Sequence, residues 1–178
     1  SSEEDVRRKL EKMRKEVDEH VRKLEEDLKR LAEEVKRHVE DLERVAKEVA
    51  DRVEEVRRQP TDKDELRKIV EELRDTLKKL RDRTEESKKR LEKLLRDLKK
   101  ETEETKKRLR ESLRKLEEDK GADKKVLDTA RDILRKLEKK LDDVDEKIER
   151  IVEKLKRELD EVNKRATETV ERLIRELK

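Results

Sequence analysis

Apolar residues recur along the chain every three or four positions, which is the pattern of an α-helix with one apolar stripe. Within the stripe, Val6, Leu24 and Leu42 follow one another at a constant spacing of eighteen. Eighteen residues make five turns of an ideal helix, so such residues lie on one line along it. We call this line a column and its spacing of eighteen a column step. A strict seven-residue repeat would instead favour left-handed supercoiling, so the pattern predicts long, nearly straight helices.

Two short polar segments interrupt this pattern. The only proline, Pro60, lies in one of them, and the only glycine, Gly121, lies in the other. Helix interiors avoid both residues, so the two segments are predicted to be loops. Loops this short require neighbouring helices to run antiparallel. The predicted helices span about 3–58, 62–119 and 123–177.

Residues that suit helix ends flank these loops. Ser2 is placed to cap the first helix, Thr61 or Asp62 the second, and Asp123 the third. Gly121 suits a left-handed conformation after the second helix. We therefore predict an all-α fold, an up-down-up three-helix bundle that forms a single domain over 1–178.

Several columns change from apolar to polar residues at two levels. In the first helix one column contains His20, His38 and Val56. The other helices have columns Leu66/Thr84/Thr102, Ile69/Ser87/Thr105 and Leu127/Asp145/Asn163.

Residue numbers indicate which of these polar residues meet. Facing residues on antiparallel helices should have a constant sum, and His20 with Thr102 and His38 with Thr84 both give 122. The other polar column of the second helix gives 125 at both levels. Parallel helices should show a constant difference, and Asp145 and Asn163 both follow the histidine of their level by 125. We therefore predict two buried polar layers: His20, Thr102, Thr105 and Asp145 in one, and His38, Thr84, Ser87 and Asn163 in the other.

The chemistry of the layers is complementary. A neutral imidazole has one hydrogen-bond donor and one acceptor, and a hydroxyl can both donate and accept. A carboxylate or amide can bond to the groups that are left. An unpaired buried polar group costs about 1–3 kcal/mol, so polar layers should meet only each other and fix the helix register. Burial among neutral partners should lower the pKa of His38, whereas Asp145 could hold a protonated His20. The alternative is that these residues lie on a solvated face.

Composition narrows the function classes. Charged residues make up 61% of the chain and aromatic residues 0%. The chain has 56 basic and 53 acidic residues, so its charge is nearly balanced. Helical periodicity argues against disorder, and the absence of a basic cluster or stacking aromatics argues against nucleic-acid binding. No apolar run is long enough to span a membrane, so a soluble protein is expected. The absence of cysteine excludes disulfides and thiolate chemistry.

The polar layers do not predict a metal, cofactor or catalytic site. His20 and His38 lie about 27 Å apart along a helix, and neither layer contains the usual zinc ligands. Ser87, His38 and Asn163 resemble a nucleophile, base and orienting residue, but no glycine-rich turn or oxyanion hole accompanies them. We therefore expect no enzymatic activity, no small-molecule substrate, no metal and no cofactor.

With its regular columns and paired His/Thr/Ser/Asp/Asn levels, the chain resembles computationally designed parametric helical bundles with buried hydrogen-bond networks. This resemblance implies an engineered monomeric scaffold without a natural activity, whose polar layers set helix register. A pH-responsive or partner-binding helical module is the alternative, followed by an apolipoprotein-like lipid-binding bundle. Self-association also stays open, because Ala32, Val45 and Ala50 widen the apolar face of the first helix.

Overall fold

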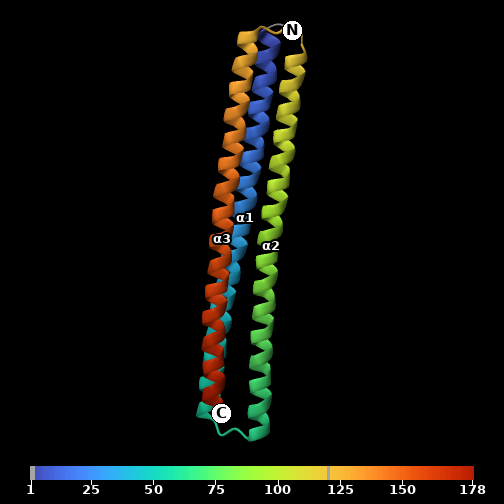
Figure 1. Ribbon diagram of the computed structural model, residues 1–178. Helices are drawn as coiled ribbons and strands as arrows, with labels where there is room; N and C mark the ends of the chain where they lie inside the picture. The colour runs from blue at the N-terminus through green and yellow to red at the C-terminus, as the bar shows by residue number, and fades with distance from the viewer. Residues whose placement is uncertain (1–2, 120) are drawn as a thin grey trace. The chain divides into compact units, whose positions relative to one another are not determined.

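The computed structural model describes residues 3–119 and 121–178, and these form three α-helices (Figure 1). The helices are α1 (Glu3–Arg58), α2 (Lys63–Glu118) and α3 (Lys124–Leu177). Their ends lie within one residue of the predicted ends, and the described residues contain no strand. The predicted all-α three-helix bundle is thus confirmed.

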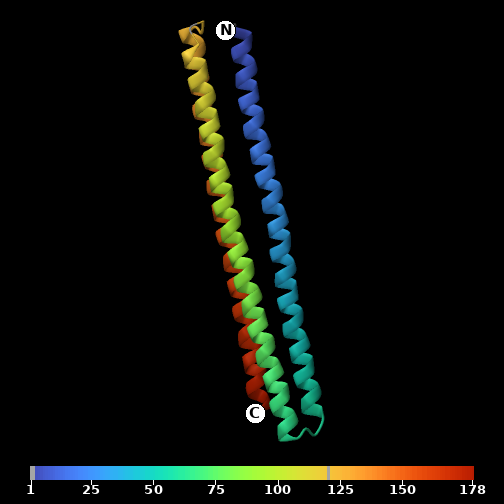
Figure 2. The ribbon, with the colours of Figure 1, turned by 90° about the vertical axis from the view of Figure 1, so that its right-hand side faces the viewer.

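The chain divides into two compact units, and each contains part of all three helices. Unit 1 comprises Ser1–Lys29 and Lys93–Ile151, and unit 2 comprises Arg30–Glu92 and Val152–Lys178. Within each unit α1 and α3 run in one direction and α2 runs in the other, as the colours in Figure 2 show. The single domain expected from the sequence stays a prediction.

Aspartates cap the N-terminal ends of α2 and α3. The Oδ1 atom of Asp62 accepts the N–H of Glu65 at 2.8 Å, which satisfies a free donor in the first turn of α2. Asp123 has the same place before α3, where its carbonyl accepts the N–H of Leu127 at 3.0 Å. The cap predicted at Ser2 lies outside the described residues.

Asp119 forms the turn after α2. The left-handed conformation predicted at Gly121 stays a prediction, because its φ angle includes an atom of residue 120, which lies outside the described residues. The Oδ1 atom of Asp119 accepts the N–H of Gly121 at 3.1 Å, and its carbonyl accepts the N–H of Ala122 at 3.2 Å.

The core of unit 1 comes from all three helices. Met13 and Val17 of α1 belong to one apolar cluster with Leu109 and Leu116 of α2 and Leu141 of α3. Burying each leucine side chain contributes about 1.5–3 kcal/mol relative to exposure.

Unit 2 has an equivalent core. Val53 of α1, Leu73 and Leu77 of α2, and Val170 and Ile174 of α3 share one cluster. The columns hold in the structure, because both members of three leucine pairs, each separated by one column step, are fully buried. These pairs are Leu24/Leu42, Leu91/Leu109 and Leu141/Leu159.

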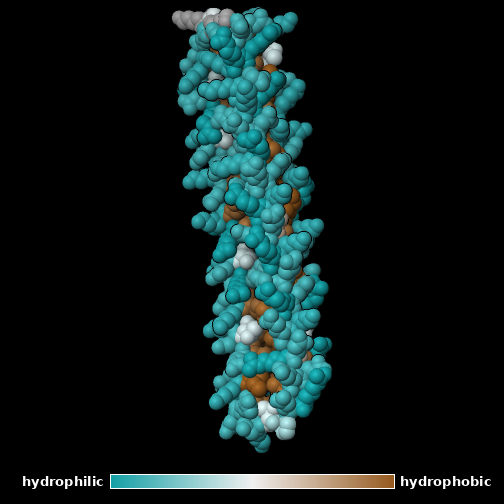
Figure 3. Space-filling view, turned by 180° about the vertical axis from the view of Figure 1, so that it is seen from behind, coloured by the Kyte–Doolittle hydropathy of each residue, from teal (hydrophilic) through white to brown (hydrophobic). Residues whose placement is uncertain are grey.

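The surface is dominated by charged side chains, with apolar residues visible only between them (Figure 3). In the described part of the chain, no large hydrophobic side chain is exposed. None of the three helices, as far as the structure describes them, has the length of apolar sequence needed to cross a membrane.

Candidate functional site

His20, Thr102 and Asp145 form a hydrogen-bonded chain in unit 1, which we call the His20 network. The Nε2 atom of His20 lies 3.1 Å from the hydroxyl of Thr102, and that hydroxyl donates to Oδ1 of Asp145 at 2.8 Å. Thr102 is fully buried, whereas the other two are partly buried. A carboxylate only accepts, so the single hydroxyl proton goes to Asp145. The Thr102 oxygen must then accept from an N–H at Nε2 of His20, which fixes the imidazole tautomer.

The corresponding residues of unit 2 form the His38 network. The Nε2 atom of His38 lies 3.2 Å from the hydroxyl of Thr84, which is 3.3 Å from Oδ1 of Asn163. The same hydroxyl lies 2.9 Å from the backbone carbonyl of Leu80. One proton is shared between two acceptors, so the bond to Asn163 is weaker than the Thr102–Asp145 bond. Thr84 and Thr102 are one column step apart, as are His20 and His38.

Thr105, a predicted member of the first layer, forms hydrogen bonds outside the His20 network. The hydroxyl of Thr105 donates to the carbonyl of Glu101 at 2.9 Å, and it accepts from Arg108 at 3.2 Å. Threonine in a helix often bonds to the carbonyl four residues earlier, and this local bond removes Thr105 from the His20 network.

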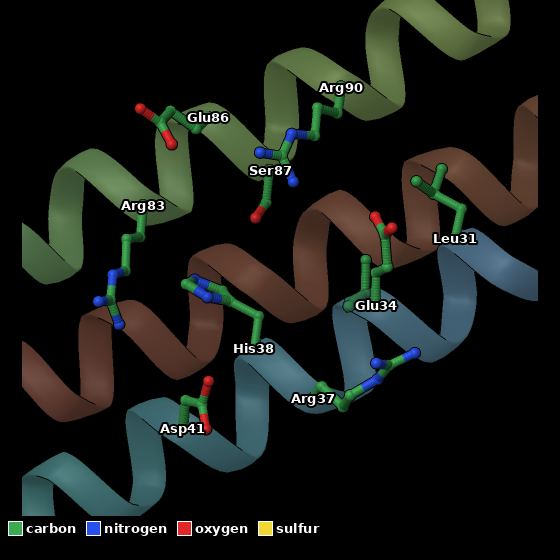
Figure 4. Close-up of a pocket in the computed structure, with 10 residues that line it drawn as sticks. Leu31, Glu34, Arg37, His38, Asp41, Arg83, Glu86, Ser87 and Arg90 are labelled. Carbon is green, nitrogen blue, oxygen red and sulfur yellow. The ribbon is translucent and has the colours of Figure 1, made fainter.

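Ser87 lies near His38 without joining its network. Both residues line a groove of about 520 Å³, in which the Ser87 hydroxyl points from α2 towards the side of His38 (Figure 4). No hydrogen bond between Ser87 and His38 occurs among the described residues, and the Nε2 atom of His38 contacts Thr84 instead. The nucleophile–base–orienter arrangement considered from the sequence is therefore not formed.

Charged neighbours distinguish the two networks. Glu101 and Lys23 lie beside His20, with 3.5 Å between the Lys23 amine and the Glu101 carboxylate. Arg83 and Asp41 act on His38. Asp41 follows Lys23 by one column step, and Arg83 precedes Glu101 by one, so the same columns carry opposite signs. The sequence prediction missed these four charged residues because it treated dense charge as a solvated face. The spacing of one column step would have identified them.

The protonation equilibria reflect these surroundings. Burial lowers the pKa of His20, while the charges of Glu101 and Asp145 oppose that change. Burial also lowers the pKa of His38, and Arg83 lowers it further against a raising effect of Asp41. The expectation for His38 is thus met. For His20, the Asp145 charge does not offset burial, and Glu101 contributes more than Asp145 does.

Asp145 is affected in the opposite sense. Burial raises the pKa of its carboxyl group, while the hydrogen bond from Thr102 and the charge of Lys106 lower it. Both shifts in this network thus favour the uncharged forms. Above both pKa values, a neutral His20 is paired with a charged Asp145.

A second set of polar contacts joins α2 to α3. Lys106 is buried and forms an ion pair with Asp142; although burial works to lower its pKa, the Asp142 hydrogen bond and charge raise it. In unit 2, Lys88 pairs with Asp160 at 3.0 Å, and that hydrogen bond raises the pKa of Lys88. The two lysines are one column step apart, and so are the two aspartates.

These pairs belong to a longer series, which we call the α2/α3 ladder. In every pair the two residue numbers add up to 248, as antiparallel packing in one register requires. In unit 1 the pairs are Glu117–Arg131, Arg110–Glu138, Lys106–Asp142 and Lys99–Glu149. In unit 2 they are Glu92–Lys156 and Lys88–Asp160.

Among the residues that the structure describes, one buried side-chain hydroxyl lacks a hydrogen-bond partner. Thr76 and Thr129 donate to the carbonyl four residues earlier, as expected for helical threonine. The Oγ1 atom of Thr167 in unit 2 is buried and has no hydrogen-bond partner. An unsatisfied buried hydroxyl lowers stability by about 1–3 kcal/mol.

The described residues contain no group of three or more His, Cys, Asp or Glu side chains that could hold a metal ion. The chemistry available at each network is hydrogen bonding and the titration of one imidazole, and only in the His20 network does the threonine hydroxyl donate to a carboxyl group.

Comparisons with known proteins agree with the fold. No protein-family model matches the chain, and no curated protein matches it. Among solved structures, it is similar to a computationally designed three-helix bundle, with 21% sequence identity and a TM-score of 0.60. The match covers 98% of this chain and 86% of the other. At this identity the similarity establishes a shared three-helix-bundle fold.

Proposed function

We propose that this protein is a designed structural scaffold without enzymatic activity, in which the two polar networks set helix register and pairing. The observation that carries this proposal is the repetition of a His–Thr contact, with its acidic or amide partner, at two levels one column step apart. The solved bundle that shares this fold carries the description "computationally designed", which supports an engineered origin.

The networks favour one register because the alternatives leave polar groups unpaired. If α2 slipped by seven residues, His20 would face Leu95 or Leu109 instead of Thr102. The imidazole N–H and the Asp145 carboxylate would then lose their partner, at about 1–3 kcal/mol for each unpaired group. Apolar layers alone impose no such penalty, because one leucine layer packs against another almost equally well.

The two levels also differ from each other. Asp145 supplies a charged acceptor in the His20 network, whereas Asn163 supplies a neutral one in the His38 network. The two levels are therefore chemically distinct.

An apolar variant of both networks tests this function. It would carry His20→Leu, Thr102→Val and Asp145→Leu together with His38→Leu, Thr84→Val and Asn163→Leu. We expect it to unfold at an equal or higher temperature but to give several sets of amide resonances, since burial is retained and register is not. A variant with Thr76→Val and Thr129→Val controls for the loss of hydroxyl groups. A single set of resonances and an unchanged molecular mass for the apolar variant would contradict the proposal.

A pH-responsive module is the second candidate, and the lowered pKa values of both histidines favour it. A histidine with a lowered folded-state pKa stabilises the fold fully above the unfolded value of about 6.5. That contribution is lost as the pH falls from there through the folded-state pKa. Loss of helicity over the same pH range in which the imidazoles titrate would support this function, and full helicity after both had titrated would exclude it.

A further inference from the structure

The α2/α3 ladder stops before the N-terminal end of α2. Its pairs follow α2 in steps of seven, four and seven residues, which together make one column step. Two repeats are complete, from position 117 to 106 and from 99 to 88. In the third repeat, the same steps place Arg81 opposite Thr167 and Arg74 opposite Ile174. The last step places Val70 opposite Lys178, so α3 offers no acid at any of the three positions.

Cationic side chains accumulate where the ladder ends. Arg81 pairs at 3.6 Å with Glu171, which lies outside the ladder register. Within the described part of the chain, no ion pair involves four neighbouring cations. These are Arg74, Lys78, Arg175 and Lys178.

All five cations line a groove of about 640 Å³ in unit 2. Its floor is apolar, because Leu77 and Ile174 also line it and are only 6% and 5% exposed. Glu171 is the one acidic side chain in the lining. The whole chain has a net charge of only +3, whereas the groove lining has five cations and one acid.

We propose that this groove binds a small amphiphilic organic anion, a function beyond that of a structural scaffold. An aryl or alkyl group of the ligand would cover Leu77 and Ile174. Its sulfonate, phosphate or carboxylate group would be bound by Arg74 and the neighbouring cations, because a guanidinium donates two parallel hydrogen bonds to such oxygens.

The size of the groove favours a small ligand over a protein partner. Its volume lies within the range of about 300–1,000 Å³ that is typical of small-molecule sites. The segment of α2 from Arg74 to Arg81 covers only about 10 Å along the helix. A stable protein interface buries about 800 Å² on each partner, which needs a longer surface.

The test uses naphthalene-1-sulfonate as the probe, titrated into the full chain at low salt and followed by amide chemical shifts and calorimetry. Naphthalene-1-sulfonamide has the same apolar body without the charge, and inorganic sulfate has the charge without the apolar body. We expect saturable one-to-one binding of the sulfonate, with shifts centred on Leu77 and Ile174, at least tenfold tighter than for either control compound. Equal binding of the sulfonamide or of sulfate, or shifts scattered over other lysine-rich surfaces, would overturn the proposal.

Two charge reversals localise the site. Arg74→Glu should weaken binding of the sulfonate at least tenfold, because it removes a guanidinium and adds a carboxylate in the groove. Lys147→Glu changes the net charge equally, on an exposed part of α3 in unit 1, and should leave the affinity unchanged. Both positions are exposed, so a circular dichroism melt should show both variants folded. Equal affinities for the two variants would contradict the proposed site.

Discussion

The His20 and His38 networks have the same imidazole–hydroxyl contact, yet their chemistry differs. Thr102 gives its proton to a carboxylate at 2.8 Å, whereas Thr84 divides its proton between a carbonyl and an amide oxygen. His20 is flanked by acids that raise its pKa against burial, while Arg83 adds to the effect of burial on His38. The column repeat thus positions equivalent groups, and the identity of the third partner and its charged neighbours decides how strongly they interact.

The largest expected difference comes from removing the central hydroxyl of each network. Thr102→Val leaves the Asp145 carboxylate and the His20 N–H without a partner, and we expect it to lower the free energy of unfolding by about 3 kcal/mol. Thr84→Val removes bonds between neutral groups only and should cost about 1.5 kcal/mol. Urea unfolding followed by circular dichroism measures both. Equal losses for the two variants would show that the charged acceptor adds nothing.

Unit 2 also contains the buried hydroxyl of Thr167, which has no hydrogen-bond partner. This unpaired group should lower the stability of unit 2. Thr167→Val replaces the hydroxyl with a methyl group of similar volume, and we expect a gain of about 1 kcal/mol. Thr76→Val is the matched control, because the Thr76 hydroxyl already bonds to the carbonyl of Glu72. If the two variants changed stability equally, Thr167 would not be the weak point of unit 2.

The two networks should also respond differently to acid. Both histidines have lowered pKa values, so each loses stability as the pH falls below about 6.5. Asp145 works in the opposite sense: its raised pKa means that protonation relieves an unfavourable buried charge as the pH approaches the unfolded value of 3.8. Asn163 offers no such relief.

Substituting the third partner sharpens this difference. Asp145→Asn should lower the pKa of His20, because it removes a charge that raises it. Asn163→Asp should raise the pKa of His38 for the same reason. A titration of the imidazole carbon-bound protons by NMR measures both values. Opposite shifts are expected, and unchanged values in both variants would mean that the third partner does not act on the imidazole.

The smallest effect concerns the flanking charges. Arg83→Glu exchanges a charge that lowers the pKa of His38 for one that should raise it, and it gives His38 the surroundings that His20 has in Glu101. The pKa of His38 should rise, with a smaller rise in the neutral variant Arg83→Gln. The same NMR titration applies. A decrease in either variant would rule out the electrostatic explanation.

Much of this architecture could be predicted from residue spacing alone. The loops at Pro60 and Gly121 placed the helix ends within one residue, because capping residues and helix breakers act locally. The constant sum of 122 identified the contacts of His20 with Thr102 and of His38 with Thr84. Register is a geometric property of straight, packed helices, so it can be predicted from constant sums of residue numbers.

Side-chain choices between two nearby partners could not be predicted in the same way. Thr105 lies at a suitable position for the His20 network but bonds to its own helix, because the carbonyl of Glu101, four residues earlier, accepts its hydroxyl proton at 2.9 Å. The α2/α3 ladder was readable from the constant sum of 248, yet dense surface charge concealed it. Its interruption at Thr167 and Ile174 became apparent only once the pairs were known.

A distance measurement within unit 1 tests the claim that the networks set register. Spin labels at Lys107 of α2 and Glu146 of α3, both exposed, would report the α2/α3 register by pulsed electron paramagnetic resonance. The unmodified networks should give one narrow distance distribution, whereas the apolar variant of both networks should give a broad distribution or a second distance, because a seven-residue slip displaces α2 by about 10 Å along α3. One narrow distribution at the same distance in both proteins would contradict the account.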